Sequence, residues 1–343
     1  MQQNWADVRQ RVETDLPTVS ILMPMRNAAP YVKRALKSIL REQSISLEVI
    51  VVDDGSTDNS RAIVQSFGDP RIVLVDGPVQ GIAASFNKAL ETATGEIIMR
   101  CDADDLYPEG RIRRQVEWLK ANPEFGAVGG SFSATDRRNW FQYELNCAGT
   151  KAKEITTDLR RGQVHTHFCA IAIRAEIARR VPARTFFRTS SDIDMQLRIG
   201  ETCRVWYEPE NAYLYRLIDS SITHSTKAPV REFYESQARR FQLQRRRRGA
   251  DDLDLGRAPQ CPVHASGQCA ASSQMQGILT AACWAAFEKD NRLKAFSYAV
   301  QAVLTRPTAI AGWRNAAILV AKTAMNGRSD RDPAVRATTG VTT

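Results

Sequence analysis

Three carboxylates crowd into one short stretch of the chain, RCDADDLYPEGR at residues 100–111, as Asp102, Asp104 and Asp105. Carboxylates this close repel one another and are costly to remove from water. An Asp-x-Asp pair after a buried strand offers hard oxygen ligands to Mg²⁺ or Mn²⁺, and Mg²⁺ usually completes its shell with substrate phosphates and waters. The pair therefore indicates a metal site that takes a phosphate-bearing ligand. The alternative is a solvated loop in which Asp104 or Asp105 caps the following helix.

Two further stretches carry paired carboxylates. In VIVVDDGSTDNS, Asp53 and Asp54 follow an apolar run, where a carboxylate can bind a base or ribose or belong to an ordinary strand–turn–helix junction. In SSDIDMQLRIGE, Asp192 and Asp194 face partly different ways on a helix, so one can act as a general base while the other pairs with Arg198. By itself, this last stretch is better explained as a surface helix with ion pairs.

The elements that must position these carboxylates alternate regularly from residue 17 to residue 130. Apolar runs predict strands at 19–23, 47–52, 72–75 and 96–100, and helical spacing predicts helices at 30–40, 58–67, 82–90 and 108–119. Strands separated by helices of this size predict a mainly parallel sheet, which binds ligands at the carboxyl ends of its strands. Asp53, Asp54, Asp102 and Asp104 all fall at such ends.

The rest of the chain reads less regularly. Further strands are predicted at 170–173 and 205–207 and a helix at 192–199. After about residue 228 the composition favours helices, with a basic stretch at Arg239–Arg248, a polar linker at 249–270, and Ala-rich helices at 273–325 broken near Arg306-Pro307. We expect the tail at 326–343 to be disordered.

Taken together, these stretches resemble the family 2 glycosyltransferases, which have the GT-A fold. The resemblance covers roughly residues 17–220 and rests on VSILMPMRNAAPYVKRALKSIL, EVIVVDDGSTDNS, GIAASFNKALETATGEIIMRCDADDLYPEGRIRRQVEWL, SSDIDMQLRIGE and YRLIDSSIT. It implies an α/β, Rossmann-like, mainly parallel sheet flanked by helices. We therefore expect an N-terminal segment at 1–16, a GT-A domain at 17–228, a helical C-terminal region at 229–325 and the tail.

The resemblance also implies roles for individual residues. Asp192 matches the second carboxylate of the family's Glu-Asp motif, the catalytic base. Asp104 would ligate the ion that bridges the diphosphate, and Asp102, the other member of the metal motif, would lie near the ribose. The remaining positions that the resemblance assigns to the donor nucleotide are Pro24, Arg26, Asn27, Asp53, Asp54, Gly81, Asn87 and Arg216.

Three positions depart from the family pattern. Ser191 stands where a Glu often precedes the catalytic Asp, which puts the acceptor contacts in doubt. Arg26 replaces a frequent aromatic residue, although a guanidinium can also stack on a base. Phe86 stands where many relatives have a basic residue near the diphosphate.

The implied reaction moves a sugar from a nucleotide-sugar, with UDP as the expected nucleotide, to an acceptor hydroxyl by a metal-assisted inverting displacement. We expect Mg²⁺ or Mn²⁺ as the cofactor and a glycan or a lipid-linked molecule as the acceptor, in polysaccharide or glycoconjugate synthesis. His165 and His167 can face the acceptor or have core roles.

Other functions explain less of the sequence. The formal net charge of +9 fits an anionic ligand, nucleic acid or an acidic membrane, and decides among none of them. An anion- or nucleic-acid-binding protein would use Arg239–Arg248, but Phe241 is the only aromatic residue there, so we expect no nucleic acid partner. MPMRNAA lacks the glycines of a dinucleotide-binding oxidoreductase. An aspartyl phosphatase would leave Asp192 unexplained.

Location and minor sites follow from composition. Residues 1–17 are polar and charged, and no apolar stretch reaches the length of a membrane span, so we expect a cytoplasmic chain. Its seven scattered cysteines favour a reduced state. Cys261, His264 and Cys269 are a weak zinc candidate with no standard spacing.

The Ala-rich C-terminal helices have two alternative uses. They carry Trp313, Ile318, Leu319 and Val320 near arginines, so they can make a peripheral contact with the inner face of the membrane. Such docking would suit a lipid-linked acceptor. Alternatively, the helices pack as a small cap on the catalytic domain.

Overall fold

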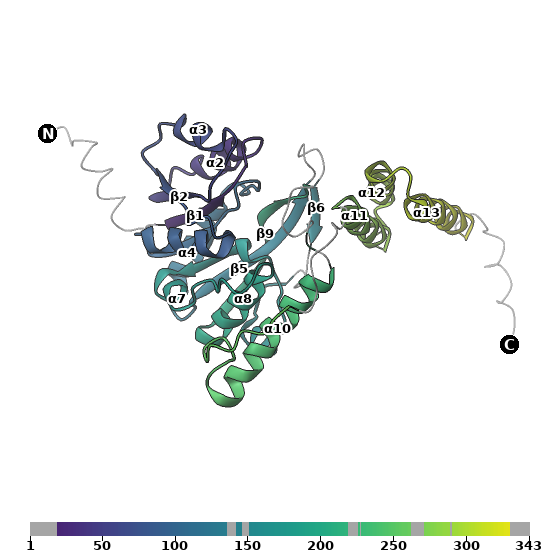
Figure 1. Cartoon of the computed structure of the whole chain (residues 1–343). Helices are drawn as coiled ribbons and strands as arrows, with labels where there is room; N and C mark the ends of the chain where they lie inside the picture. The colour runs from purple at the N-terminus through teal and green to yellow at the C-terminus, as the bar shows by residue number, and fades with distance from the viewer. Residues whose placement is uncertain are drawn as a thin grey trace, which may run out of the picture. The chain divides into compact units, whose positions relative to one another are not determined.

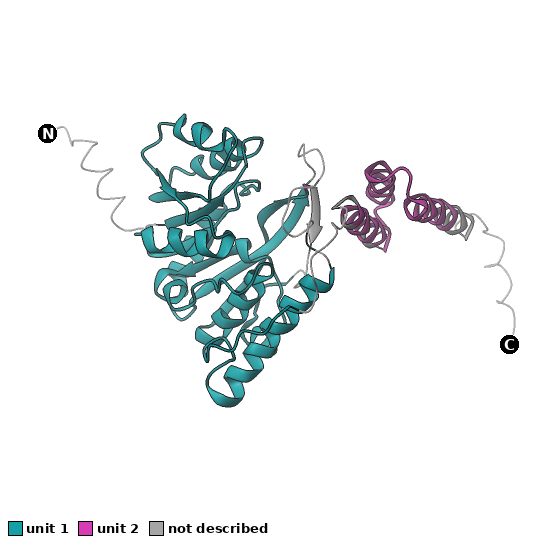
Figure 2. Cartoon of the chain, in the orientation of Figure 1, with its two compact units in different colours: residues 1–217, 226–266 teal, residues 218–225, 267–343 magenta. Residues whose placement is uncertain are grey.

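The computed structural model of the chain describes residues 19–135, 142–145, 151–218, 226, 228–261, 271–288 and 290–329 (Figure 1). The chain divides into two compact units (Figure 2). The first comprises residues 1–217 and 226–266, and the second comprises residues 218–225 and 267–343. The predicted N-terminal segment at 1–16 lies outside the described residues.

The first unit is built around one sheet. Its described strands run in the order β3-β2-β1-β4-β8-β5-β9-β7, with β6 paired to β5. They are β1 (Val19–Met25), β2 (Leu47–Asp53), β3 (Ile72–Asp76), β4 (Ile97–Arg100), β5 (Ala127–Thr135), β6 (Gln142–Leu145), β7 (Lys153–Glu154), β8 (Ile171–Arg174) and β9 (Val205–Arg216). The β3-β2-β1-β4 half is parallel, and β8 joins it to β5 by antiparallel pairing on both sides. The predicted mainly parallel sheet is therefore confirmed.

Helices cover both faces of this sheet (Figure 1). They are α2 (Val32–Leu40), α3 (Ser60–Gln65), α4 (Ile82–Thr92), α5 (Arg111–Ala121), α6 (Thr156–Arg160), the short 3-10 helix η1 (Phe168–Ala170), α7 (Ala175–Arg180), α8 (Ser191–Thr202) and α10 (Ala228–Arg248). Along β1, Ile21 and Met23 pack with α2 and α5, whereas Leu22 packs with α4. Burial on both faces explains why the parallel strands read as continuous apolar runs.

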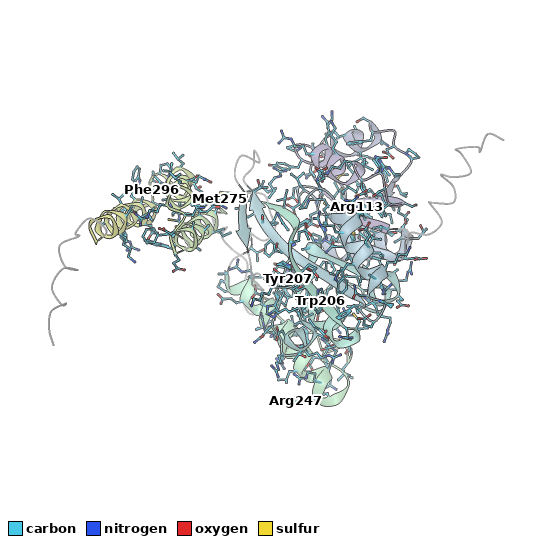
Figure 3. The ribbon with its side chains drawn as sticks, turned by 180° about the vertical axis from the view of Figure 1, so that it is seen from behind. Arg113, Trp206, Tyr207, Arg247, Met275 and Phe296 are labelled. Carbon is cyan, nitrogen blue, oxygen red and sulfur yellow. The ribbon has the colours of Figure 1, made fainter. Side chains whose placement is uncertain are left out.

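The strands at the other end of the sheet are also buried on both faces, although their sequences are not continuous apolar runs. Neighbouring β9 residues, Trp206 and Tyr207, belong to the cores on opposite faces of the sheet (Figure 3). Their partner strand β5 was not predicted, because AVGGSFSAT is rich in glycine and polar residues. Gly130 is needed there, since a Cβ at this position would lie 2.4 Å from the Cβ of Ala212 on β9.

Two predicted boundaries differ from the structure. The helix predicted from residue 108 begins at Arg111, because Gly110 adopts a left-handed φ of 68° and ends the preceding turn. The helix α10 belongs to the first unit, not to a separate C-terminal region beginning at 229. It packs on α8 through an apolar cluster of Phe187, Leu197, Tyr234, Ala238 and Phe241.

The predicted polar linker at 249–270 is described up to residue 261, and its first part is a packed turn. Asp251 in that turn is fully buried and lies 2.6 Å from Arg184 and 2.5 Å from Arg245. The turn therefore fixes the end of α10 to the first unit. His264 and Cys269 of the zinc candidate lie outside the described residues.

The second unit consists, in its described part, of α11 (Ala271–Glu288), α12 (Arg292–Thr305) and α13 (Ile310–Ser329). The predicted break at Arg306-Pro307 is confirmed, since it separates α12 from α13. The disordered tail was predicted to begin at residue 326, but α13 continues to Ser329. Residues 330–343 lie outside the described residues. Within the described residues, no helix has both the length and the hydropathy needed to cross a bilayer.

Candidate active site at the carboxyl ends of the parallel strands

The predicted strand-end residues meet at one edge of the sheet. The strands β2, β1 and β4 are adjacent and parallel, so their carboxyl ends lie side by side. Asp53 and Asp54 end β2, and Asp102 follows β4. Between them, the last two residues of β1, Pro24 and Met25, are buried, and exposed Arg26 and Asn27 follow.

Asn27 connects the loops that follow β1 and β2. It adopts a left-handed φ of 52°, which asparagine tolerates better than most residues. Its backbone N–H donates to Ser56 Oγ at 3.0 Å, and its Oδ1 accepts from the N–H of Thr57 at 2.8 Å. These bonds tie the two loops together, and Arg26 beside them is exposed.

The pair after β2 is buried and partly used by the protein itself. Asp53 Oδ1 accepts from the N–H of Ser56 at 3.0 Å, and its Oδ2 lies 3.5 Å from Arg61 Nη1. Asp54 Oδ2 accepts from the N–H of Gly81 at 2.8 Å, at the start of α4. The second oxygen of Asp54, Oδ1, is buried and accepts no hydrogen bond from the described residues. Asp54 and Gly81 thus act together to set the position of α4.

Asn87, further along α4, holds another segment of the chain in place through its side-chain amide. Its Nδ2 donates to the carbonyl of Ala183 at 2.8 Å, and its Oδ1 accepts from the N–H of Ala183 at 2.8 Å. The reciprocal pair fixes the segment that precedes α8 against α4. The sequence had assigned Asn87 to the segment beside the donor, and the structure shows its amide engaged with this backbone.

The first carboxylate of the Asp-x-Asp pair already has a counter-charge. Arg100 donates from Nε to Asp102 Oδ1 at 2.7 Å and from Nη2 to Oδ2 at 3.1 Å. Burial by itself would lower the pKa of Arg100, but the charge of Asp102 outweighs it and the pKa is raised. The sequence reading missed this arginine, although it stands only two residues before Asp102 in the same stretch.

Within the described part of the chain, no ion pair of this kind reaches the side chain of Asp104. Burial, together with the charge of Asp102, raises the pKa of Asp104 to about 6. Its backbone carbonyl, by contrast, accepts from Arg216 Nε at 2.6 Å. Arg216 is buried at the end of β9, and its guanidinium lies 5.4 Å from the ring centre of Tyr31. Burial lowers the pKa of Arg216.

Asp105, whose role the sequence left open, joins the loop after β4 to β9. It accepts from Tyr213 Oη at 2.6 Å and from the N–H of Arg216 at 2.7 Å, and it is 1% exposed. Burial, followed by the charges of Asp104 and Asp102, raises the pKa of Asp105 well above its usual value. Asp105 therefore connects the acidic loop to the strand that ends in Arg216.

The two carboxylates of α8 have separate environments. Asp194 is fully buried and lies 3.4 Å from Arg198 and 3.8 Å from Arg184. The predicted pairing with Arg198 is confirmed for this residue. Asp192, in the first turn of the same helix, is partly exposed. Asp192 is thus the member of the pair that solvent or a substrate can reach.

His167 lies among the carboxylates of the site. Its ring stacks on Tyr213 at 5.2 Å, and its Nδ1 accepts from the N–H of Cys169 at 3.3 Å. Burial lowers the pKa of His167, while the charges of Asp192 and Asp102 act against that effect. Both carboxylates are therefore within electrostatic reach of one imidazole. His165 lies elsewhere, with its Nε2 2.8 Å from Asp158 Oδ2.

Sequence comparisons identify the family of this region. Residues 20–181 match the family model of Glycosyl transferase family 2. Similar curated proteins include the uncharacterized glycosyltransferase EpsJ of Bacillus subtilis, 28% identical over 63% of this chain and 65% of that protein. Another is the UDP-Glc:alpha-D-GlcNAc-diphosphoundecaprenol beta-1,3-glucosyltransferase WfgD of Escherichia coli, 34% identical over 38% of this chain and 56% of that one. The chain thus spans less than two thirds of these relatives.

Solved structures agree on the fold. TarS 1-349 of S. aureus in complex with UDP-GlcNAc superposes with a TM-score of 0.57 at 16% identity, covering 70% of this chain and 69% of that one. The same protein with UDP gives a TM-score of 0.54 at 15% identity, covering 70% of this chain and 68% of that one. The chain therefore carries a glycosyl transferase family 2 domain at residues 20–181, and the unit that contains this domain has the GT-A fold.

Proposed function

We propose that the chain transfers a sugar from a UDP-sugar to an acceptor hydroxyl, with inversion at the anomeric carbon, in polysaccharide or glycoconjugate synthesis. One observation carries the proposal: η1, the short helix that follows His167, contacts both β4, which leads to Asp102, and α8, which carries Asp192. A metal-motif carboxylate and a candidate base therefore belong to one site. WfgD, named for UDP-Glc, and TarS, solved with UDP-GlcNAc, support UDP as the nucleotide.

A divalent cation, Mg²⁺ or Mn²⁺, fits the acidic loop. Asp104 is a hard oxygen donor whose burial raises its pKa to about 6, and a cation beside it would favour the charged form. Asp102 is shared with Arg100, so Asp104 would be the main protein ligand. Mg²⁺ usually completes its shell with substrate phosphates and waters, so the proposal needs few protein ligands. When bound, the ion would neutralise the charge that develops on the leaving diphosphate.

The side chains of the chain perform the remaining work. Asp192 takes the proton from the acceptor hydroxyl, and the oxygen attacks the anomeric carbon from the face opposite the nucleotide. The bond to the nucleoside diphosphate breaks in the same displacement, which inverts the configuration. Arg216 supplies a buried positive charge next to the acidic loop, where the diphosphate would lie. Asp53, Asp54 and the loop of Arg26 and Asn27 form the side that holds the base and ribose.

The acceptor class is a glycan or a lipid-linked molecule. WfgD is named for a diphosphoundecaprenol-linked sugar, which supports the lipid-linked alternative. The charge of Asp192 acts on the pKa of His167, and η1, which follows His167, contacts α8, so His167 is our candidate for a contact with the acceptor.

The alternative that Arg239–Arg248 binds nucleic acid is weakened, because several of these arginines already form ion pairs within the protein. Arg245 lies 2.8 Å from Glu201 and 2.5 Å from Asp251, so it is committed to the interior. Arg248 lies 2.6 Å from Asp252 and Arg240 lies 3.4 Å from the same carboxylate. Internal ion pairs therefore account for much of this basic stretch.

The experiment that tests the proposal measures release of nucleoside diphosphate by the purified full chain from UDP-, GDP- and dTDP-sugars, with Mn²⁺ and with EDTA. We expect release from a UDP-sugar that depends on the metal. Asp104→Ala should weaken metal-dependent nucleotide binding, whereas Glu91→Gln, an exposed carboxylate on α4, should not change it. Release that is equal with GDP- and UDP-sugars would contradict the donor class, and nucleotide binding that ignores EDTA would contradict the metal.

A further inference from the structure

The described helices of the second unit expose large apolar side chains to an unusual extent. Leu293 is 87% exposed, Leu304 71% and Ile310 81%, and the Trp313 ring is more than half exposed. The other exposed large apolar residues of α12 and α13 are Val300, Ile318 and Val320. Scattered single residues of this kind are normal, but a concentration on two helices marks an interaction site.

These residues form stripes at helical spacing. On α12, Leu293, Val300 and Leu304 are seven and four residues apart, so they share one side of the helix. The opposite side is used for packing, and its buried residues include Ala295, Tyr298, Ala299 and Ala302. On α13, Ile310, Trp313 and Val320 are three and seven residues apart and form a second stripe. Each helix is therefore amphipathic with its large apolar residues facing outward.

The charge around the stripes is mainly positive, and the acidic residue beside Leu293, Asp290, is paired with Arg292 at 3.1 Å. Residues 291–329 contain no Asp or Glu, and their basic residues are Arg292, Lys294, Arg306, Arg314, Lys322 and Arg328. Lys294 follows Leu293 directly, and Arg314 follows Trp313, so exposed cations border both stripes. A surface that is apolar in the middle and mainly basic at its edges complements an anionic lipid surface.

Trp313 suits a position at such a boundary. Its Nε1–H donates to the carbonyl of Pro307 at 2.9 Å, so the polar group of the indole is satisfied within the protein. The exposed ring can then enter an apolar environment without an unpaired donor.

We propose that α12 and α13 dock the chain peripherally on an anionic lipid surface. The two stripes insert at the boundary between head groups and acyl chains, and the bordering lysine and arginine side chains contact the anionic head groups. The docking needs neither donor nor acceptor, so it goes beyond the proposed transfer reaction and is tested without it.

The experiment is flotation of the full chain with vesicles of phosphatidylcholine, alone or mixed with phosphatidylglycerol. We expect flotation with the anionic vesicles that weakens as salt is added. Arg314→Ser should weaken binding about five-fold, the effect of one cation near such a surface. The pair Leu304→Ser and Trp313→Ser should weaken it by at least roughly ten-fold, since both side chains lose apolar burial.

The control is Leu255→Ser, which removes a 45% exposed leucine from the first unit and should leave flotation unchanged. UDP release by the Leu304→Ser/Trp313→Ser variant should also stay unchanged, and circular dichroism should show that its helices are retained. Failure of the wild-type chain to float with anionic vesicles overturns the proposal. Flotation that the variants do not alter, or a wild-type dimer in light scattering that the double variant converts to monomer, overturns it as well.

Discussion

Arg100 and Asp102 form a two-bonded ion pair, with N–O distances of 2.7 and 3.1 Å, directly at the carboxyl end of β4. The first carboxylate of the Asp-x-Asp pair is therefore neutralised by the protein before any ligand arrives. Arg100 therefore relieves part of the repulsion among the carboxylates of RCDADDLYPEGR. The positive charge that is still missing is needed beside Asp104, whose pKa is raised.

The Arg100–Asp102 pair can be measured by a double-mutant cycle. Arg100→Met leaves Asp102 as an unpaired carboxylate that is only partly exposed, and we expect the free energy of unfolding to fall by about 2–3 kcal/mol. Asp102→Asn in the same background should recover part of this loss, because the unpaired charge disappears. Urea denaturation of the four proteins measures the coupling. Additive effects of the two substitutions would show that the pair contributes nothing of its own.

The raised pKa of Asp104 predicts a pH dependence of stability with a defined sign. A carboxyl group whose pKa is higher in the folded than in the unfolded chain binds more protons when folded. Its contribution is fully present below the unfolded value of about 4 and is lost as the pH rises through about 6. Between these limits the metal-free chain should lose up to about 3 kcal/mol relative to Asp104→Asn.

The measurement is urea denaturation of both proteins across that pH range in EDTA, since other carboxylates titrate in the same window and cancel in the comparison. Mn²⁺ should reduce the difference, because it favours the charged form of Asp104. A wild-type chain that gains stability relative to Asp104→Asn as the pH rises would contradict the assignment.

Comparing substitutions of Asp251 and of its neighbour Asp252 tests how α8, the helix that carries Asp192, is held in place. Asp251 is fully buried between Arg184 and Arg245, and these arginines also reach Asp194 and Glu201 on α8. Asp251→Asn leaves buried cations without their partner, so the free energy of unfolding should fall by about 3–5 kcal/mol. Asp252→Asn affects the less buried ion pairs with Arg248 and Arg240 and a hydrogen bond from Gln244, so the urea midpoint should fall by clearly less. Equal effects of the two substitutions would mean that the turn after α10 is not anchored through Asp251.

The elements that were predictable are those whose signal is local. Parallel strands buried on both faces give continuous apolar runs such as VSILM, and strand-end carboxylates then follow from topology. The strand β5 was not predictable, because its glycine-rich sequence is strand-like only in contact with β8 and β9. The position of α10 was missed for a similar reason, since Phe241 packs on Phe187, which lies far away in the sequence.

The contacts of the candidate site also divide into those that local sequence patterns predict and those that depend on distant parts of the chain. The side chains at the ends of β2 and β4 could be grouped from the sequence, because adjacent strands bring them together. The partners of Asp105 could not, because Tyr213 and Arg216 lie more than a hundred residues further along the chain. Asn87 illustrates the remaining gap: its position was identified, but its double hydrogen bond to Ala183 depends on a loop that no local pattern describes.

The central claim is that Asp192 is the base that activates the acceptor. The most direct measurement compares turnover and donor affinity for Asp192→Asn and the wild-type chain, with Glu91→Gln as the control for an exposed carboxylate. We predict that Asp192→Asn lowers turnover by about 10²- to 10⁴-fold and leaves the dissociation constant of the UDP-sugar unchanged. A variant that retains its turnover, or one that loses donor affinity in proportion to its turnover, would contradict the account.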